Sequence, residues 1–402
     1  MLIEIHMLKN FPATNLNRDD TGAPKNCIFG GIQRGRISSQ CLKRSWRMSP
    51  LFQRDMAGLF GKRTRKMPKL VVDQLKERGM AEEYLETVKK VLTEFAKGDK
   101  KGKEEKETAT EQESGNITNQ VIFYSSDDIQ AIVKAVETEV KRCGSVEVFA
   151  APEKTGTAKQ KKNESKKRIK VIEDALEKTA AIRGITLDMA LFGRMVTSKA
   201  LTNVEASMQV AHAFSTNKVI MESDFFTAMD DMIDGDEELG SAMMDDVDYN
   251  SSCYYIYASL DTEKLKENLR HADAPDALVK AAVPSLLRAM AFTNPSGKQN
   301  TFAGHALPSA VLVECKNEPI PVSYANAFVA PAVAKGERDL VTDSIGKLMD
   351  QVKTTMADFP SLNEGRRFWF CTGGKVKFDQ EGTTDCGNFD ELVKSVTEVL
   401  EK

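Results

Sequence analysis

The sequence predicts an α+β protein whose core follows the order β-α-β-β-α-β and carries two long insertions. Alternating apolar and polar residues predict four strands, at residues 2–8, 204–214, 252–260 and 309–315. Helical periodicity predicts two helices between them, at 40–47 and 274–292. A long polar segment follows the first helix, and an acidic segment separates the two middle strands, which predicts the insertions.

The first strand is expected to be half-buried. Ile3, Ile5 and Met7 share one of its faces, whereas Glu4 and His6 share the other. This pattern is typical of a strand that packs on a core with one side only.

Positive charge is concentrated between Asn15 and Arg47, although the whole chain has a net charge of -3. The stretch holds two acids, Asp19 and Asp20, against seven basic residues: Arg18, Lys25, Arg34, Arg36, Lys43, Arg44 and Arg47. Cations spread over about thirty positions fit an extended polyanion better than a single nucleotide.

The helix at 40–47 begins after two candidate N-cap residues, Ser38 and Ser39, and ends before Pro50. Leu42 and Trp46 share one face of this helix. Four polar side chains share another: Gln40, Lys43, Arg44 and Arg47. One face is therefore expected to pack, and the other to present cations beside a helix start that favours phosphate.

A phosphate-binding P-loop is excluded, although Gly30 and Gly35 have the spacing of one. Arg36 and Ile37 stand where Lys and then Ser or Thr should be, and the preceding apolar run is too short for a buried strand. We therefore expect no nucleotide-hydrolase site here.

Residues 50–205 are expected to form a helical insertion that leads back to the core. Its clearest helix, at 126–143, has Ser126 as a cap and Gly144 as a stop. Two low-complexity tracts, 97–116 and 153–170, are expected to be surface loops or insert tips.

Strand alternation returns near 185–193 and is clearest at 204–214. His212 falls on the apolar face of the second segment, so we interpret it as a core histidine. A second, strongly acidic insertion follows, with eleven Asp or Glu and no Lys or Arg between Val219 and Asp248. Pro284 is expected to kink the helix at 274–292.

The predicted order is that of ferredoxin-like (RRM-like) RNA-recognition folds. The predicted divisions are a first core part at 1–49, the helical insertion at 50–205, a core strand at 206–217, the acidic insertion at 218–251 and a second core part at 252–402.

Composition indicates a soluble cytoplasmic protein. Hydrophobic residues make up 41% of the chain and charged residues 29%, and no apolar run is long enough to span a bilayer. The seven cysteines are odd in number and form no C-x-x-C pair, which indicates reduced thiols rather than disulfides or zinc ligands. Neither a metal nor a cofactor is expected. A net charge near zero leaves binding through one basic groove open.

Several motifs resemble the CasC family, the backbone subunit of the type I-E CRISPR Cascade complex. Near the N-terminus these are NLNRDD, FGG and RISSQCLKRSWR, in that order. Later segments that agree are GRMVTS at 193–198, MQVAHAFSTNKV at 208–219, DFFTAMDD at 224–231 and SGKQNTFAGHALP at 296–308. The resemblance implies a hand-like protein with a ferredoxin-like palm, helical fingers and a hairpin thumb.

The resemblance also implies a set of binding residues. In the palm, the positions that hold the RNA backbone correspond to Arg18, Lys25, Ser38, Gln40, Lys43, Arg44 and Arg47. We include Asn17, Arg34 and Arg36 from the same stretch. The family pattern also places the loop cation Lys298, in SGKQ, near the RNA. Positions that wedge against or flank a flipped-out nucleotide correspond to Met195, Phe225, Phe226 and Thr227. Lysines that follow target DNA correspond to Lys166, Lys167 and Lys170.

The function implied is a non-catalytic scaffold for CRISPR RNA. Copies would stack head to tail along the RNA, pair it with target DNA, and join other Cascade subunits and, through the complex, a recruited helicase-nuclease. Delegating sequence recognition to base pairing agrees with the absence of a base-reading pattern. The acidic thumb is expected to face a neighbouring subunit's basic surface or solvent.

Two other functions stay open. One is a ferredoxin-like endoribonuclease that processes CRISPR RNA, with His6 as acid or base. The other is a lone single-strand RNA-binding protein. Asp19 and Asp20 are either a metal pair or, as readily, a turn with a salt bridge to Arg18.

Overall fold

The computed structural model describes residues 1–96, 117–150, 158–228, 243–362, 364–374 and 376–401. The chain divides into two compact units. Unit 1 comprises residues 1–57, 208–264 and 276–402, and unit 2 comprises 58–207 and 265–275. Each unit is described by itself below. The predicted tract at 97–116, part of the tract at 153–170 and the centre of the acidic insertion lie outside the described residues.

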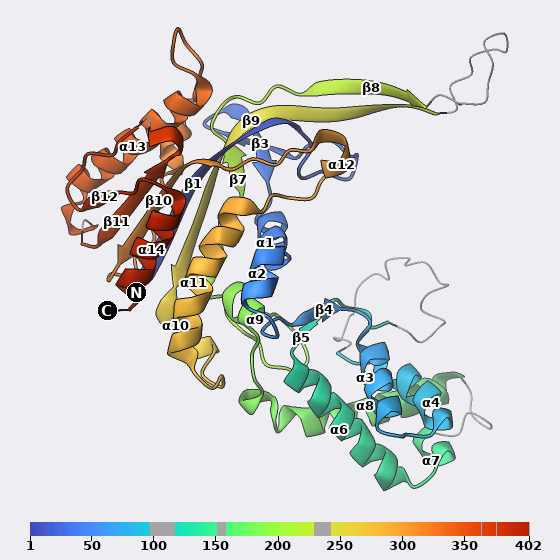
Figure 1. The fold of residues 1–402 in the computed structure, drawn as a ribbon. Coiled ribbons are helices and arrows are strands. Elements are labelled where there is room, and N and C mark those ends of the chain that lie inside the picture. Colours follow the sequence, from blue (N-terminus) through green and yellow to red (C-terminus); the bar gives the residue numbers. More distant parts are fainter. Residues whose placement is uncertain (97–116, 151–157, 229–242, 363, 375, 402) are drawn as a thin grey trace, which may run out of the picture. The chain divides into compact units, whose positions relative to one another are not determined.

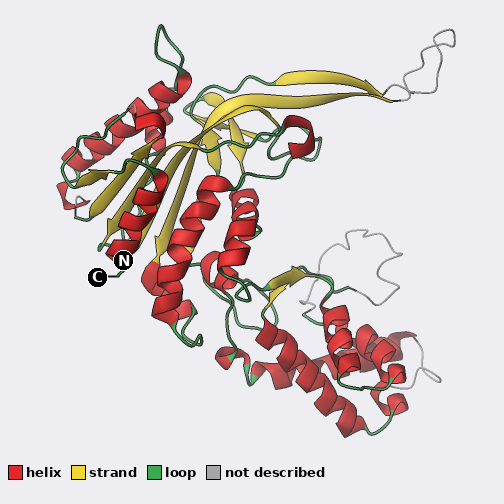
Figure 2. Cartoon of the chain, in the orientation of Figure 1, coloured by secondary structure: helices red, strands yellow, loops and turns green. Residues whose placement is uncertain are grey.

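Unit 1 is built on a mixed sheet (Figures 1 and 2). Its strands are β1 (Leu2–Thr14), β2 (Asn26–Phe29), β3 (Ile32–Ile37), β6 (Met208–Val210), β7 (Ala213–Ser215), β8 (Glu222–Ala228), β9 (Met243–Asp261), β10 (Pro308–Lys316), β11 (Arg366–Cys371) and β12 (Thr383–Asp385). Their order is β12-β11-β10-β1-β9-β7-β3-β2, with β6 and β8 also paired to β9. The described neighbours are antiparallel except β11 and β12.

Strand β1 lies at the centre of this sheet, between β9 and β10. It is longer than predicted, and Glu4 and His6 are as fully buried as Ile3 and Ile5 on its other face. The half-buried prediction is therefore wrong, because helices cover both faces of the sheet. The strands predicted at 252–260 and 309–315 are confirmed.

The helices of unit 1 are α1 (Ser39–Arg47), α2 (Pro50–Asp55), α11 (Pro275–Phe292), α12 (Gln299–Phe302), α13 (Leu340–Asp358) and α14 (Phe389–Leu400), with 3-10 turns at Ala325–Phe328, Pro360–Leu362 and Thr372–Gly374. Helix α13 packs on the sheet face that carries Leu8 and Trp369. Helix α14 packs on the opposite face, where Phe389 contacts Phe370 of β11 and Phe292 of α11. The predicted helices at 40–47 and 274–292 are confirmed, and α11 runs through Pro284.

The strand predicted at 204–214 is two short strands with a change of register between them. From Val210 to Phe214 this chain advances four residues, while its partner β9 advances three, from Ala258 to Tyr255. The extra residue reverses which side chains face the core. His212 is therefore exposed, and its prediction as a core histidine is wrong.

Unit 2 is mainly helical. Its elements are β4 (Lys62–Thr64), α3 (Met67–Glu77), α4 (Glu82–Leu92), β5 (Ile122–Tyr124), α6 (Ser126–Cys143), α7 (Val146–Ala150), α8 (Ala158–Glu177), a 3-10 turn at Ala180–Ile182 and α9 (Leu187–Phe192), while α10 (Thr262–Asn268) spans the boundary between the units. Apolar side chains of α3, α4, α6 and α8 share its core. The helix predicted at 126–143 is confirmed, but Ser125 rather than Ser126 caps it, and Gly144 ends it with φ 73°. The alternation at 185–193 is wrong, since α9 lies there.

Within the described residues, no helix combines the length and apolarity needed to cross a bilayer.

Candidate nucleic-acid interface

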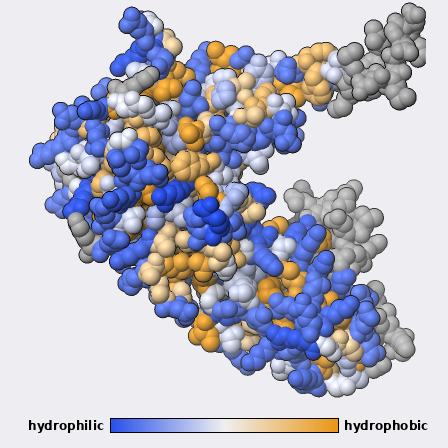
Figure 3. Space-filling view, in the orientation of Figure 1, coloured by the Kyte–Doolittle hydropathy of each residue, from blue (hydrophilic) through white to orange (hydrophobic). Residues whose placement is uncertain are grey.

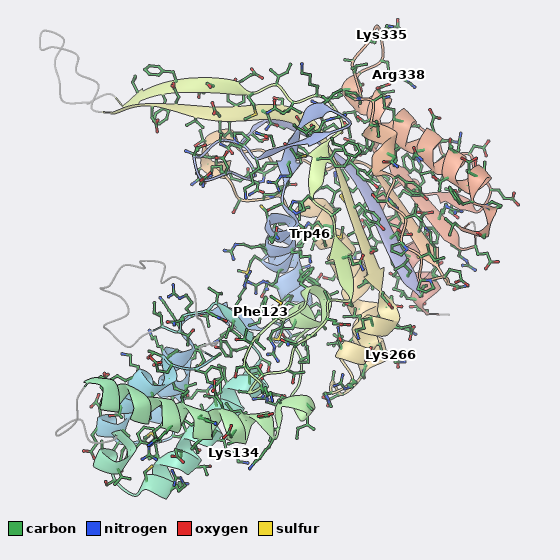
Figure 4. The ribbon with its side chains drawn as sticks, turned by 180° about the vertical axis from the view of Figure 1, so that it is seen from behind. Trp46, Phe123, Lys134, Lys266, Lys335 and Arg338 are labelled. Carbon is green, nitrogen blue, oxygen red and sulfur yellow. The ribbon has the colours of Figure 1, made fainter. Side chains whose placement is uncertain are left out.

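Helix α1 is amphipathic as predicted. Leu42 and Trp46 are buried (Trp46 is labelled in Figure 4), and the other face carries Gln40, Lys43, Arg44 and Arg47. The Ser38 hydroxyl accepts a hydrogen bond from the Cys41 N-H at 3.3 Å and so caps the helix. The Asn17 side chain accepts a hydrogen bond from the Ser38 N-H at 2.8 Å. Asn17 and Ser38 therefore fix the start of α1, and their role toward RNA stays a prediction.

Four cations of the stretch form what we call the cationic strip: Arg18, Lys25, Lys43 and Arg44. Among the described residues, no carboxylate lies within ion-pair distance of any of them. Arg18 and Arg44 are exposed, and Lys25 and Lys43 are half-buried. The strip therefore presents positive charge that the protein itself does not neutralise.

The fold brings members of the strip together. Burial raises the pKa of the Cys41 thiol, and the positive charges of Lys25 and Arg44 act in the opposite direction. Two cations that are distant in sequence thus lie near one side chain. Burial also lowers the pKa of Lys43. A nearby anion would act in the opposite direction, because it favours the charged form of the amine.

Asp19 forms a turn rather than a metal pair. Its Oδ1 accepts hydrogen bonds from the Thr21 N-H, the Thr21 hydroxyl and the Ala23 N-H, at 2.9, 2.7 and 3.1 Å. The hydrogen bond from Thr21 is the main reason that the pKa of Asp19 is lowered. The turn shapes the loop between Arg18 and Lys25. Across the described part of the chain, no group of three His, Cys, Asp or Glu side chains could hold a metal ion.

The prediction that Arg34 binds RNA needs a correction, because this side chain is completely buried. Its guanidinium donates to four main-chain oxygens: Ser215, Thr216, Phe328 and Val329. The shortest of these bonds, to the Thr216 oxygen, is 2.6 Å. Arg34 holds three segments of unit 1 together, and the prediction that it binds RNA is withdrawn.

Arg36 is half-buried, and its guanidinium has two partners within the protein. Its Nε donates to the Asn26 oxygen at 3.2 Å, and its Nη1 lies 3.0 Å from His212 Nδ1. Burial, and then the charges of Arg36 and Lys25, lower the pKa of His212. A neutral His212 can accept this hydrogen bond without repelling the guanidinium of Arg36.

Lys298 lies in a loop that packs against the start of the basic stretch. At Gly297, an added Cβ would lie 2.3 Å from the Leu16 oxygen and 2.6 Å from the Asn15 oxygen. Lys298 itself adopts a left-handed backbone conformation, with φ 48°. The structure therefore brings the loop of Lys298 beside Leu16, which lies 282 residues earlier in the sequence (298 − 16). Lys298 has no carboxylate partner among the described residues.

The hairpin of β8 and β9 carries the three predicted flanking residues. Phe225 is 62% exposed and Phe226 is 37% exposed, and they point to opposite faces because they are adjacent in one strand. Phe225, Phe226 and Thr227 lie opposite Asp246, Asp245 and Met244. Figure 3 shows hydrophobic surface along this hairpin.

Sequence reasoning missed the residue that fixes the hairpin base. Asn15 is fully buried, and its side-chain amide donates to the oxygens of Gly22 and Asp248, both at 2.9 Å. It ties the loop of the basic stretch to β9. Its place at the start of NLNRDD is the only signal in the sequence that could have suggested a role.

The remaining predicted residues belong to unit 2. Met195 is 94% exposed on the segment after α9. Lys167 and Lys170 are exposed on α8, whereas the side chain of Lys166 lies outside what the structure describes.

His6 is completely buried within unit 1. Its Nδ1 lies 2.8 Å from the Tyr255 hydroxyl, and its Nε2 lies 3.3 Å from Glu314 Oε2. Burial would raise the pKa of Glu314, but the hydrogen bond and charge of His6 and the charges of Lys316 and Arg367 lower it to about 2. An imidazole enclosed in this network has no access to an RNA strand, which removes the geometric basis for the endoribonuclease alternative.

Comparisons with known proteins support one family. A family model described as CT1975-like protein matches residues 3–395. A chain of a "CRISPR RNA-guided surveillance complex, pre-nicking" has a TM-score of 0.78 and 25% identity over 100% of both chains. A chain of another "CRISPR RNA-guided surveillance complex" has a TM-score of 0.68 and 20% identity over 99% of this chain and 100% of that one, a likeness of fold alone. A search of curated proteins found no match.

Proposed function

The chain belongs to the CT1975-like protein family, and on this premise we propose that it is a non-catalytic, RNA-binding backbone subunit of a Cascade-type CRISPR surveillance complex. The likeness to a chain of such a complex over both full lengths supports a Cascade-type role. The finer assignment to the CasC family of type I-E complexes rests on the motifs between Asn15 and Arg47.

The observation that carries the proposal is the cationic strip. Its members, Arg18, Lys25, Lys43 and Arg44, come from one short stretch of a chain with a net charge of -3, and none has a carboxylate within ion-pair distance among the described residues. Lys298 adds a fifth cation from a loop packed against Asn15 and Leu16, at the start of the basic stretch. Such a surface binds phosphates in a row without reading bases, as a guide carrier requires.

The proposal includes a ferredoxin-like palm in unit 1. The adjacent strands β10, β1, β9 and β7, with α1 and α11 between them in sequence, support this description. The hairpin of β8 and β9 would be the thumb, and the helical unit 2 the fingers.

In this function, the CRISPR RNA lies along the strip, and copies of the chain stack head to tail along it. Met195, Phe225, Phe226 and Thr227 flank a displaced nucleotide, where a thioether or a ring can fill the gap left by an unstacked base. Lys166, Lys167 and Lys170 follow target DNA. Other Cascade subunits and, through the complex, a helicase-nuclease complete the assembly, which works in the cytoplasm.

The test is the mass of the particle formed by the full chain with CRISPR RNA. Guides of increasing length should recruit additional copies, each adding the chain mass of 44.5 kDa, as measured by native mass spectrometry. A single copy on every length of RNA would refute the backbone assignment and favour a lone single-strand RNA-binding protein. Cleavage of repeat RNA that His6→Ala abolishes would refute the non-catalytic role.

A further inference from the structure

Met195 is the most exposed of the large apolar side chains in the described part of the chain, at 94%. Its two neighbours in sequence, Arg194 and Val196, are buried at 5% and 7%. The burial of both neighbours restricts the backbone at Met195, while the Met195 side chain itself protrudes. The surroundings of this one position therefore decide where the thioether can go.

The backbone is fixed on both sides of Met195. The Arg194 N-H donates to the Val204 oxygen at 2.9 Å, and the Val204 N-H donates back to the Arg194 oxygen at 2.8 Å. On the other side, the Val196 N-H donates to Asn203 Oδ1 at 2.7 Å. Both peptide groups that flank Met195 are thus anchored to one short segment of the chain.

The Arg194 side chain anchors the segment to unit 2. Its Nη1 lies 2.5 Å from Asp128 Oδ2 and donates to the Phe123 oxygen at 3.3 Å, on strand β5 (Phe123 is labelled in Figure 4). Its Nε donates to the Thr202 oxygen at 2.9 Å. One planar guanidinium thus joins β5, α6 and the segment that carries Met195.

Asp128 is itself held in place. Its Oδ2 accepts a hydrogen bond from the Ser125 N-H at 3.0 Å, while its own N-H donates to the Ser125 hydroxyl at 3.0 Å. This capping box fixes the carboxylate to the first turn of α6. A second buried arginine, Arg183, lies 3.4 Å from Asp128 Oδ1. The carboxylate is therefore a rigid reference point rather than a mobile partner.

A buried ion pair of this kind seldom makes a fold more stable than apolar residues would. It does impose one geometry, because each hydrogen bond of the guanidinium has a fixed direction. The network fixes the backbone beside the only side chain of the segment 194–196 that is exposed. Its most direct consequence is therefore the position of Met195.

We propose that Arg194, Asp128 and Asn203 are positioning residues that hold Met195 ready to insert between the bases of single-stranded RNA. The inference rests on the proposed function and adds to it how the insertion is preorganised. A backbone that is already fixed at the point of insertion loses less conformational entropy than a mobile one. Weakening the network should therefore reduce base unstacking while the cationic strip still binds the strand.

The experiment uses the full chain bound to a guide RNA that carries 2-aminopurine, a base whose fluorescence rises when it is unstacked. Each guide has the probe at one position. Binding to the wild type should raise the fluorescence at particular positions, and Met195→Ala should remove that rise. Arg194→Gln and Asn203→Ala should each reduce the rise by at least about half, with RNA affinity within about threefold of the wild type.

Two further variants separate positioning from a general loss of stability. Arg168→Gln breaks another ion pair of unit 2, in which Arg168 Nη1 lies 2.8 Å from Glu139 Oε1, and should leave the fluorescence unchanged. Arg194→Lys keeps the positive charge beside Asp128 but loses the hydrogen bond from Nε to the Thr202 oxygen. It should therefore show a larger fluorescence rise than Arg194→Gln, but a smaller one than the wild type. Asn203 is exposed, and its substitution by Ala should fold even where Arg194→Gln does not.

The outcomes distinguish this inference from the proposed function. Full fluorescence in folded Asn203→Ala and Arg194→Gln would overturn the positioning role, even if Met195→Ala loses the signal. An equal loss in Arg168→Gln would overturn it as well, since the effect would then follow stability. A wild-type protein that binds no RNA would refute the proposed function itself.

Discussion

Replacing Lys43 and Arg44 together by Gln should weaken RNA binding equally for all sequences and reduce its dependence on salt. Both side chains lie on the polar face of α1, and neither has a carboxylate partner within the described residues. Losing them removes two phosphate contacts and adds no buried cavity. The change therefore tests the electrostatic term alone.

The magnitude follows from the number of cations without an acid partner. With Lys298, the cationic strip offers five contacts per copy, and each contributes about 0.7 to the slope of log affinity against log salt on a single strand. The expected slopes are about 3.5 for the wild type and about 2.1 for the variant. A fourfold rise in salt should then weaken the wild type about 130-fold and the variant about 18-fold.

The assay is fluorescence anisotropy with short RNAs of unrelated sequence over a series of salt concentrations. The control replaces Lys280 and Lys394, which are exposed on α11 and α14, by Gln, so that the net charge changes equally. This control should keep the wild-type slope. A slope that both variants lower equally, or an affinity loss confined to some RNA sequences, would refute the reasoning.

Three more predictions test single residues. Arg34→Met should lower the free energy of unfolding by about 3 kcal/mol in urea titrations, because buried main-chain oxygens lose a charged donor, yet leave the salt slope unchanged. Gly297→Ala should displace the Lys298 loop from the Leu16 oxygen and so lower the salt slope of RNA binding by about 0.7. Lys298→Gln should lower the slope equally, and a wild-type slope in both variants would exclude the loop from RNA binding. Burial lowers the pKa of Lys9 to about 7, below its unfolded value, so the penalty for burying its charge applies fully below pH 7 and is relieved as pH rises toward 10.5. The unfolding free energy of the wild type relative to Lys9→Met should therefore rise over this range, by on the order of 5 kcal/mol, and a flat difference would contradict the burial of an ionisable amine there.

The central elements were predictable because local pattern and burial agree there. Strands β9 and β10 and helices α1 and α11 have the expected periodicity. The prediction for the segment 204–214 was wrong because one extra residue reverses which side chains point toward the core. The apolar pattern of a sequence does not show where such a bulge lies. The segment 185–193 failed because six residues can fit either period, and the helix α9 prevailed.

The binding residues show a different limit. A sequence shows which residues are cations but not which of them the fold already uses. Arg34 and Lys43 are both cations of the basic stretch, yet main-chain oxygens of two distant segments, 215–216 and 328–329, surround the Arg34 guanidinium. Those oxygens are brought together only by the sheet. Nothing local to residue 34 could have predicted them.

The distinction between cations that the fold already uses and cations that it leaves without an acid partner also applies to the cationic strip. The sequence places seven basic residues between Asn15 and Arg47. In the structure, Arg34 is used internally and Arg36 is shared with His212, while the cationic strip keeps its charge without an acid. Repulsion within such a strip costs free energy in the isolated chain, and a bound polyanion would remove that cost. Because no carboxylate among the described residues lies within ion-pair distance of these four cations, we interpret the uncompensated charge as a binding surface rather than a solvated face.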